Sequence, residues 1–157
     1  MRRKDREITE LEEIYEILRS AEYGTLSMSD NGKPYAVPMS CAFFLEAGEP
    51  YLSWHGAGVG TKVEILRKNP EIFYSCVSEC RRDFAPERLH WSFFYQSACA
   101  SGRAEEVYDI NEKNRLLHRL LQQYGEINSF EFPRPMLEKL SVWKCHLTAL
   151  SGKAHKE

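Results

Sequence analysis

Apolar positions recur along this chain with two periods, one of three to four residues and one of two residues. The first period is typical of amphipathic helices, and the second is typical of strands with one buried face. The helical period predicts helices at residues 9–21, 62–68, 109–124 and 136–140. The pairs Thr9 with Glu12 and Asp109 with Glu112 have the spacing of a capping box, which marks a helix start.

The period of two predicts strands at residues 23–28, 35–45, 51–55, 72–78, 91–107 and 142–150. Asn31–Gly32 predicts a tight hairpin between the first two of them. Because Pro38 lies inside the second strand, that strand must be at an edge or contain a bulge. Gly102 indicates a bend, and the polar residues 79–89 predict a loop. Six strands joined mostly by hairpins, with peripheral helices, predict a mainly β fold, a small antiparallel barrel.

Composition narrows the class of protein. The chain has 157 residues without a repeat or a linker, which predicts a single domain over residues 1–157. A net charge of −2 provides no broad field that would attract nucleic acid or a membrane surface. The longest apolar run, residues 42–45, is far too short to span a bilayer. The basic start of the chain is not followed by the apolar stretch of a secretory signal.

The five cysteines are odd in number and scattered through apolar contexts. This pattern predicts free thiols rather than a disulfide framework. The sequence contains no CxxC pair, so no metal site is predicted. Free thiols favour a reducing compartment, and we expect a cytoplasmic protein.

A glycine-rich segment at residues 53–70, SWHGAGVGTKVEILRKNP, is the first candidate for chemistry. Its spacing fits neither the P-loop nor the dinucleotide fingerprint. Glycines nevertheless let a backbone approach a ligand closely, and a helix N-terminus offers unpaired N–H groups. Thr61 and Lys62 at that terminus would suit one terminal phosphate. The alternative is an ordinary turn between a strand and a helix, with a solvated lysine.

Three segments, GKPYAVPMS, WHGAGVGTKVEILRKNP and YQSACASGRAEEV, together resemble the FMN-binding split-barrel superfamily of pyridoxamine 5'-phosphate oxidase. Within it, the chain is most similar to the 5-nitroimidazole reductase (Nim-type, antibiotic resistance) branch. The start MRRKDREI and the end LSGKAHK extend the resemblance to nearly the whole chain. The resemblance implies a six-stranded antiparallel split β-barrel with peripheral helices, and a homodimer that binds two FMN molecules at its interface.

The resemblance also implies which residues contact FMN. They are Val37, Pro38, Met39, Ser40, His55, Gly56, Ala57, Thr61, Lys62, Ser97 and Trp143. Residues 37–40 would line the flavin ring, Thr61 and Lys62 would hold the phosphate, and Ser97 matches a polar position that reaches the cofactor.

For two residues of this set, the sequence leaves two alternative roles open. His55 would lie beside the flavin as a proton donor, or it would only pack there. Trp143 would reach the partner's flavin, or it would belong to the core.

The implied function is an FMN-dependent reductase of a small, electron-poor, nitroimidazole-like substrate. YAVPMS lacks the basic residue of the pyridoxamine-type oxidases, which argues against pyridoxamine phosphate as substrate. Pyridoxamine phosphate oxidation stays a weaker alternative. Another alternative is a flavin- or haem-binding protein without turnover, with His55 as a possible axial ligand of haem. The aromatic run Trp91, Phe93, Phe94 and Tyr95 would leave apolar surface exposed in a monomer, which also favours a homodimer.

Overall fold

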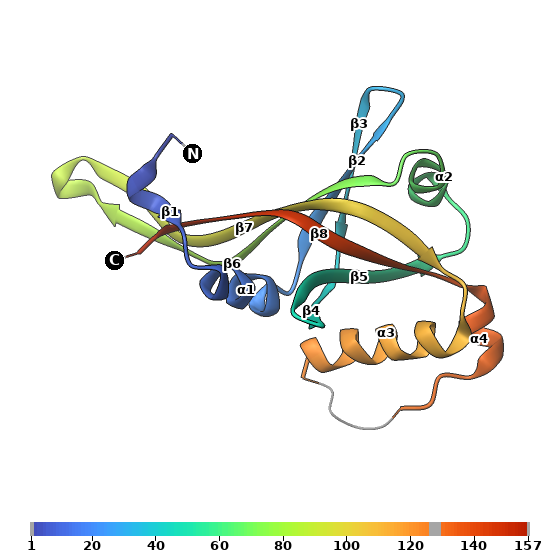
Figure 1. The fold of residues 1–157 in the computed structure, drawn as a ribbon. Coiled ribbons are helices and arrows are strands. Elements are labelled where there is room, and N and C mark those ends of the chain that lie inside the picture. Colours follow the sequence, from blue (N-terminus) through green and yellow to red (C-terminus); the bar gives the residue numbers. More distant parts are fainter. Residues whose placement is uncertain (1, 126–129, 157) are drawn as a thin grey trace.

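Eight antiparallel strands form one sheet in the computed structural model, which describes residues 2–125 and 130–156 (Figure 1). The strands are β1 (Glu7–Ile8), β2 (Gly24–Asp30), β3 (Lys33–Met39), β4 (Ala42–Glu46), β5 (Glu49–Ala57), β6 (Glu71–Ala85), β7 (His90–Val107) and β8 (Leu140–His155). The helices are α1 (Leu11–Ser20), α2 (Thr61–Lys68), α3 (Ile110–Gln123) and α4 (Arg134–Lys139), with 3₁₀ turns η1 (Lys4–Arg6) and η2 (Pro86–Arg88).

The order of the strands explains why the barrel is split. The sheet runs β3-β2-β6-β7-β8-β5-β4, with β1 added to β8. Strands β3 and β4 follow each other in the chain, yet they lie at opposite ends of this order. Leu26 of β2 and Phe43 of β4 nevertheless share one buried core cluster, so the sheet curves round without closing. The predicted mainly β split-barrel fold is confirmed.

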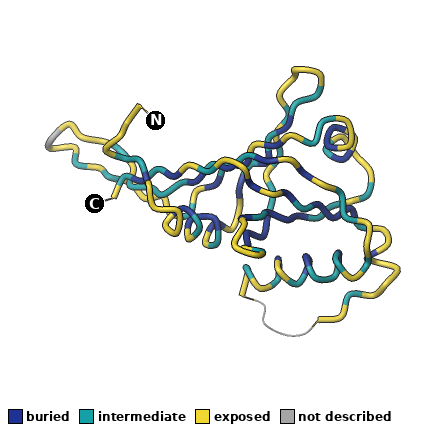
Figure 2. Tube along the Cα trace, viewed as in Figure 1, coloured by how far each residue is buried: buried dark blue, intermediate teal, exposed yellow. Residues whose placement is uncertain are grey.

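The core lies on the concave side of the sheet, where alternate residues of the central parts of the strands are buried (Figure 2). Along β7, Ala98 and Ala100 are buried while their odd-numbered neighbours are not. Helix α1 covers this side with Ile14, Ile17 and Leu18, the apolar face that its sequence period predicts. The helix therefore fills one end of the barrel.

One predicted strand, at residues 35–45, is wrong because the ladder breaks at Ser40 and Cys41. The chain must pass there from one end of the sheet to the other, so these backbone groups lose their strand partners. The side-chain amide of Gln123 replaces them. Its Nε2 donates to the carbonyl oxygens of Cys41 (2.9 Å) and Leu18 (3.3 Å), and its Oε1 accepts from the N–H of Phe43 (2.6 Å).

The loop predicted at residues 79–89 is wrong for residues 79–85, and only residues 86–89 form the turn. Strand β6 continues to Ala85 and pairs with β7 down to the Ala85–His90 pair, forming a long hairpin. Both faces of this hairpin are largely exposed, so its sequence shows no alternation of apolar and polar residues. The two additional strands, eight instead of six, come from the break at residue 40 and from the short β1.

The local signals at turns and helix starts had mixed outcomes. Asn31 and Gly32 both have positive φ, 50° and 85°, in the predicted β2–β3 hairpin. Pro38 lies in β3, an end strand of the sheet, as predicted. The capping box at Thr9 is wrong, since the N-cap of α1 is Glu10 and makes no side-chain cap. Residues 7–8 pair with β8 instead, which delays the start of the helix.

Other predicted features are confirmed. The pairing of β7 with β8 shifts register between Ser101 and Gly102, which is the bend that the glycine indicated. The carboxylate of Asp109 caps α3 and accepts from the N–H of Glu112 at 2.8 Å.

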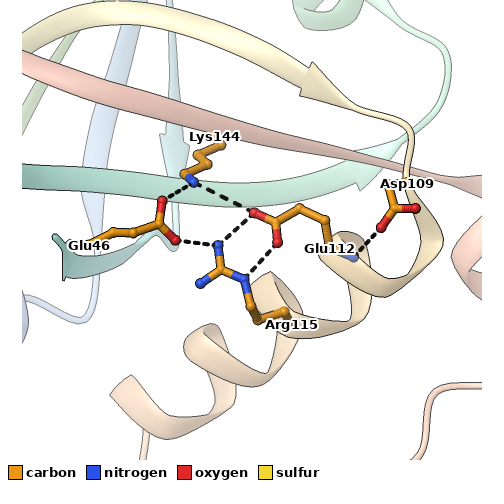
Figure 3. Close-up of polar contacts among 5 residues, drawn as sticks. All are labelled: Glu46, Asp109, Glu112, Arg115 and Lys144. Carbon is orange, nitrogen blue, oxygen red and sulfur yellow. Dashed lines mark hydrogen bonds and ion pairs between the residues drawn. The ribbon is translucent and has the colours of Figure 1, made fainter.

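Helix α3 is tied to the sheet by the charged side chains drawn in Figure 3. Arg115 pairs with Glu112 on its own helix (2.6 Å) and with Glu46 of β4 (2.7 Å). Lys144 of β8 pairs with Glu46 and lies 3.6 Å from Glu112. The network joins one helix to two strands and fixes where the end of α3, with Gln123, meets the break.

We predict that Gln123→Ala lowers the free energy of unfolding by about 1–3 kcal/mol, because it leaves buried backbone groups without partners. Gln122→Ala, at an exposed neighbouring position of the same helix, is the matched control. Chemical denaturation monitored by circular dichroism measures both. Equal stability of the two variants would contradict the role of the amide.

Candidate functional site

A groove of about 270 Å³ lies between β3, the end of β5 and the start of α2. We call it the Lys62 groove, and its lining residues are Tyr35, Val37, Met39, Ala57, Val59, Gly60, Thr61, Lys62 and Val63. Five of the predicted site residues therefore come together here. Tyr35 was missed, although the period of two that links it to Val37 and Met39 could have found it. Val59, Gly60 and Val63 were missed as well.

The start of α2 is shaped by the glycine segment. Gly60 is the N-cap residue with φ 123°, a conformation that other residues rarely adopt, and it contributes no side-chain cap. Buried Val63, Ile65 and Leu66 hold the helix against the barrel. The first-turn N–H groups thus lack a capping side chain at the edge of the groove, where an anion is favoured.

Lys62 is the charged residue of the groove. Its ammonium group is half-buried and donates to the sulfur of Met39 at 3.1 Å. A β-carbon on residue 56 would lie 3.2 Å from this nitrogen, so glycine at that position makes room for it. Burial lowers the pKa of Lys62, and no carboxylate pairs with it among the described residues. An anion bound beside it would stabilise the charged form.

A second groove, of about 330 Å³, lies on the convex side of the sheet. We call it the outer groove, and it is lined by Tyr23, Gly24, Thr25, Pro38, Ser75, Cys76, Val77, Ser97, Ala98 and Cys99. Pro38 alternates with Val37 and Met39 along β3, so it points away from the Lys62 groove. The predicted residues Pro38 and Ser97 therefore lie together, on the opposite face of the edge strand.

His55 lies in neither groove. With Ser53 it borders a space under Leu116 and Leu117 of α3 that is too narrow for a water molecule. Its Nδ1 is buried and has no hydrogen-bond partner among the described residues. Burial, and secondarily the charge of Lys62, lowers the pKa of His55 below its ordinary 6.5. Burial therefore favours the neutral form of the ring.

Trp143 is a core residue. Its ring stacks on Trp54 with centroids 6.5 Å apart and planes 7° apart, and its indole N–H donates to the hydroxyl of Ser141 at 2.7 Å. The side chain is buried, so it lines neither groove. Of the other predicted residues, Ser40 lies between strands β3 and β4, where the strand pairing is interrupted, and Gly56 lies against Lys62.

A larger cavity, of about 380 Å³, lies beside the N-terminal segment and the end of β8. Its charged groups include Arg3 and Asp5, which pair with each other at 2.5 Å. It contains none of the predicted site residues, so its size alone does not make it the functional site.

The family model described as pyridoxamine 5'-phosphate oxidase matches residues 10–154. The chain belongs to the pyridoxamine 5'-phosphate oxidase family. This family binds flavins, and its members are of the flavin-dependent oxidoreductase type. The search of curated proteins finds no match.

Solved structures share the split-barrel fold of the family. A candidate 5-nitroimidazole antibiotic resistance protein of Bacteroides thetaiotaomicron is 25% identical, with a TM-score of 0.80 over 94% of this chain and 85% of that one. The flavocytochrome Anf3 of Azotobacter vinelandii is 19% identical, with a TM-score of 0.82 over 100% of this chain and 72% of that one. An FAD- and haem-binding protein of Mycobacterium smegmatis is 18% identical, with a TM-score of 0.82 over 97% of this chain and 74% of that one.

Among the helices of the described residues, none has the length and apolar character that crossing a membrane requires.

The lowered pKa of His55 predicts how stability depends on pH. The unfolded state takes up a proton on this histidine near pH 6.5, while the folded state takes it up only at lower pH. Stability should therefore fall as the pH falls from 6.5 toward the folded pKa. Urea unfolding at pH 7.5 and 5.5 should show a smaller loss for His55→Gln than for the unmodified protein. His118→Gln is the control, and an unchanged loss in His55→Gln would contradict the assignment.

Proposed function

We propose that this protein is an FMN-dependent reductase of small electron-poor molecules such as nitroimidazoles. The observation that carries the proposal is the half-buried Lys62, which has no carboxylate partner among the described residues and lies beside an apolar groove. A buried positive charge without a counter-ion costs free energy unless an anion binds next to it. A terminal phosphate is such an anion.

The residues of the Lys62 groove fit the two ends of FMN. Lys62, the Thr61 hydroxyl and the first N–H groups of α2 would hold the phosphate. Tyr35 lies four residues from Met39 on the same face of β3, about 14 Å along the strand. This wall of Tyr35, Val37 and Met39 would support a flat ring. FMN, when bound, supplies the redox chemistry, and the chain supplies binding and orientation.

Three observations bear on substrate and cofactor. Similarity to the Bacteroides protein, at 25% identity, supports a nitroimidazole-like substrate. Residues 35–40 contain no basic side chain to pair with the phosphate of pyridoxamine phosphate, which argues against that substrate. His55 lies under α3 and not in the Lys62 groove, so its position does not favour axial coordination of haem.

The functional unit in this proposal is a homodimer. The Lys62 groove, at about 270 Å³, is smaller than the ~300–1,000 Å³ of typical cofactor sites, which suggests that one copy forms only part of the site. The convex face of the sheet, opposite α1, has small residues on β7 such as Ser97 and Ser101. Exposed Phe73 and Val77 of β6 flank them. Small side chains with nearby apolar groups suit the close approach of a second sheet.

The compartment in this proposal is the cytoplasm. All five cysteines lie within the described residues and are free thiols. Free thiols persist in a reducing compartment, whereas an oxidising one favours their pairing. Location of the tagged protein by fractionation of the source cells checks this.

We predict that Lys62→Ala weakens FMN binding by roughly ten- to a hundredfold, because a charge-assisted hydrogen bond contributes about 1.5–3 kcal/mol. Riboflavin, which lacks the phosphate, should bind weakly to both forms. Lys68→Ala, an exposed lysine of the same helix, is the matched control. Titration followed by flavin fluorescence measures all three proteins. Unchanged FMN affinity in Lys62→Ala would contradict phosphate binding by Lys62 and would favour the alternative, an ordinary turn between strand and helix.

We predict that the purified protein shows flavin absorption bands, or gains them on FMN titration. It should then oxidise NAD(P)H, or another electron donor, in the presence of a nitroimidazole. Bound FMN without turnover would identify a flavin-binding protein instead. Absence of flavin binding would reject the proposed function. Release of hydrogen peroxide from pyridoxamine phosphate would support the oxidase alternative.

A further inference from the structure

The end of the β6–β7 hairpin extends beyond the barrel as an arm, which we define as residues 79–95 (Figure 1). Strand β8 accompanies β7 only as far as the pair Tyr95–His155. Beyond that pair the arm is two-stranded, and its tip is exposed (Figure 2). An isolated two-stranded hairpin is marginally stable in water. The arm therefore lacks the third strand, or the packed helix, that would normally stabilise a hairpin and cover its side chains.

The two faces of the arm differ. On one face the side chains contact each other: Arg81 lies over the ring of Phe94 at 4.4 Å, and His90 pairs with Asp83 at 2.7 Å. The other face, which we call the aromatic face, contains Phe84, Trp91 and Phe93. These side chains are 66%, 74% and 53% exposed. Of the two faces, the aromatic face is the one with large exposed apolar groups, and Leu89 at the tip of the arm is exposed as well.

The aromatic face is continuous with the convex face of the barrel. Strand β7 pairs with β6 without a register shift from Trp91 to Gln96, so residues 91, 93 and 95 lie on one side of it. The same alternation leads to Ser97 and Cys99, which line the outer groove. One side of β7 thus joins the arm to the face proposed for dimerisation, past a register shift whose additional residue lies in β6, between Val77 and Glu79.

Area and charge favour a protein as the occupant of this face. Aromatic side chains bury about 150–250 Å² each, so these three would supply roughly 290–480 Å² from their exposed fractions. A stable interface needs about 800 Å² per partner, so the arm must combine with a neighbouring patch, and the convex face adjoins it. Residues 79–90 contain three arginines and three carboxylate residues, which gives no excess charge to attract nucleic acid or anionic lipid.

We infer that the aromatic face of the arm docks onto a second copy of this chain, where it extends the homodimer interface. The inference rests on the homodimer of the proposed function. The interface is two-fold and self-complementary, so each copy contributes one arm and receives one. Trp91, the most exposed of the three aromatic residues, is buried in the dimer and anchors the contact.

Tryptophan quenching tests the inference directly, because Trp54 and Trp143 are buried and only Trp91 is exposed within one chain. Acrylamide quenching is measured across a dilution series whose dimer content is known from analytical ultracentrifugation. The quenching constant should rise severalfold as the dimer dissociates. Trp91→Phe, which lacks the exposed indole, should show no such rise. Quenching that stays high throughout a stable dimer would overturn the inference.

Substitutions test how much the contact contributes. Trp91→Ser should weaken dimerisation by about a hundredfold, since each copy loses roughly tenfold and the interface contains the residue twice. Tyr108→Ser removes an equally exposed aromatic side chain that lies outside the arm, and it should leave the dimer unchanged. Equal dimer affinity of the two variants would overturn the inference, as would a strictly monomeric protein. Protection of Trp91 by neutral phosphatidylcholine vesicles instead of by a second copy would overturn it in favour of a membrane contact.

FMN titration of the same samples separates this inference from the proposed function. A dimer that depends on Trp91 but does not bind FMN would retain the arm contact and reject the flavin function. If the protein binds FMN and Trp91→Ser leaves the dimer affinity unchanged, the flavin function is retained and the arm contact is rejected.

Discussion

The break between β3 and β4 is the constraint on which this fold depends. A sheet that curves round but does not close must leave backbone groups unpaired where the chain crosses its opening, and buried groups of this kind need partners. Here the amide of Gln123 supplies them from the end of α3, and it also holds the last turn of α1 through Leu18. The positions of α1 and α3 relative to the opening between β3 and β4 are therefore set by the same hydrogen bonds, and so is the curvature of the sheet there.

The opening makes β3 an edge strand, and both faces of that strand become available. Val37 and Met39 point to the Lys62 groove, whereas Pro38 points to the outer groove. A ligand at this edge can contact side chains of both faces only by crossing the strand. A second copy packed on the convex face would lie next to the same edge. Cofactor binding and dimerisation are thus coupled by geometry in the proposed function.

Local patterns in the sequence were sufficient for most elements of the fold. The period of α1, the turn at Asn31–Gly32 and the cap at Asp109 depend on neighbours within a few residues. The break at residue 40 depends on Gln123, more than eighty positions away, so no local pattern could reveal it. The β6 half of the arm was missed because neither face of the arm is buried, and the period of two disappears without a buried face.

The candidate site was predictable to a smaller extent. The glycine segment before a helix start indicated Thr61 and Lys62, family resemblance added Val37 and Met39, and the structure brings all four into one groove. Resemblance does not show which way a side chain points. For Trp143 the sequence left two alternatives, the partner's flavin or the core, and the structure places its side chain in the core, stacked on Trp54.

The burial of the thiols has a practical consequence for labelling. Burial raises the pKa of Cys41 to about 12, of Cys76 to about 11 and of Cys145 to about 12, so these thiols stay protonated and shielded at neutral pH. Cys99 is half-covered, and burial raises the pKa of its thiol too. Cys80 alone among the five is exposed, at the root of the arm. A maleimide-linked fluorophore or spin probe would therefore attach mainly there, giving a native reporter of the arm's surroundings without an engineered cysteine.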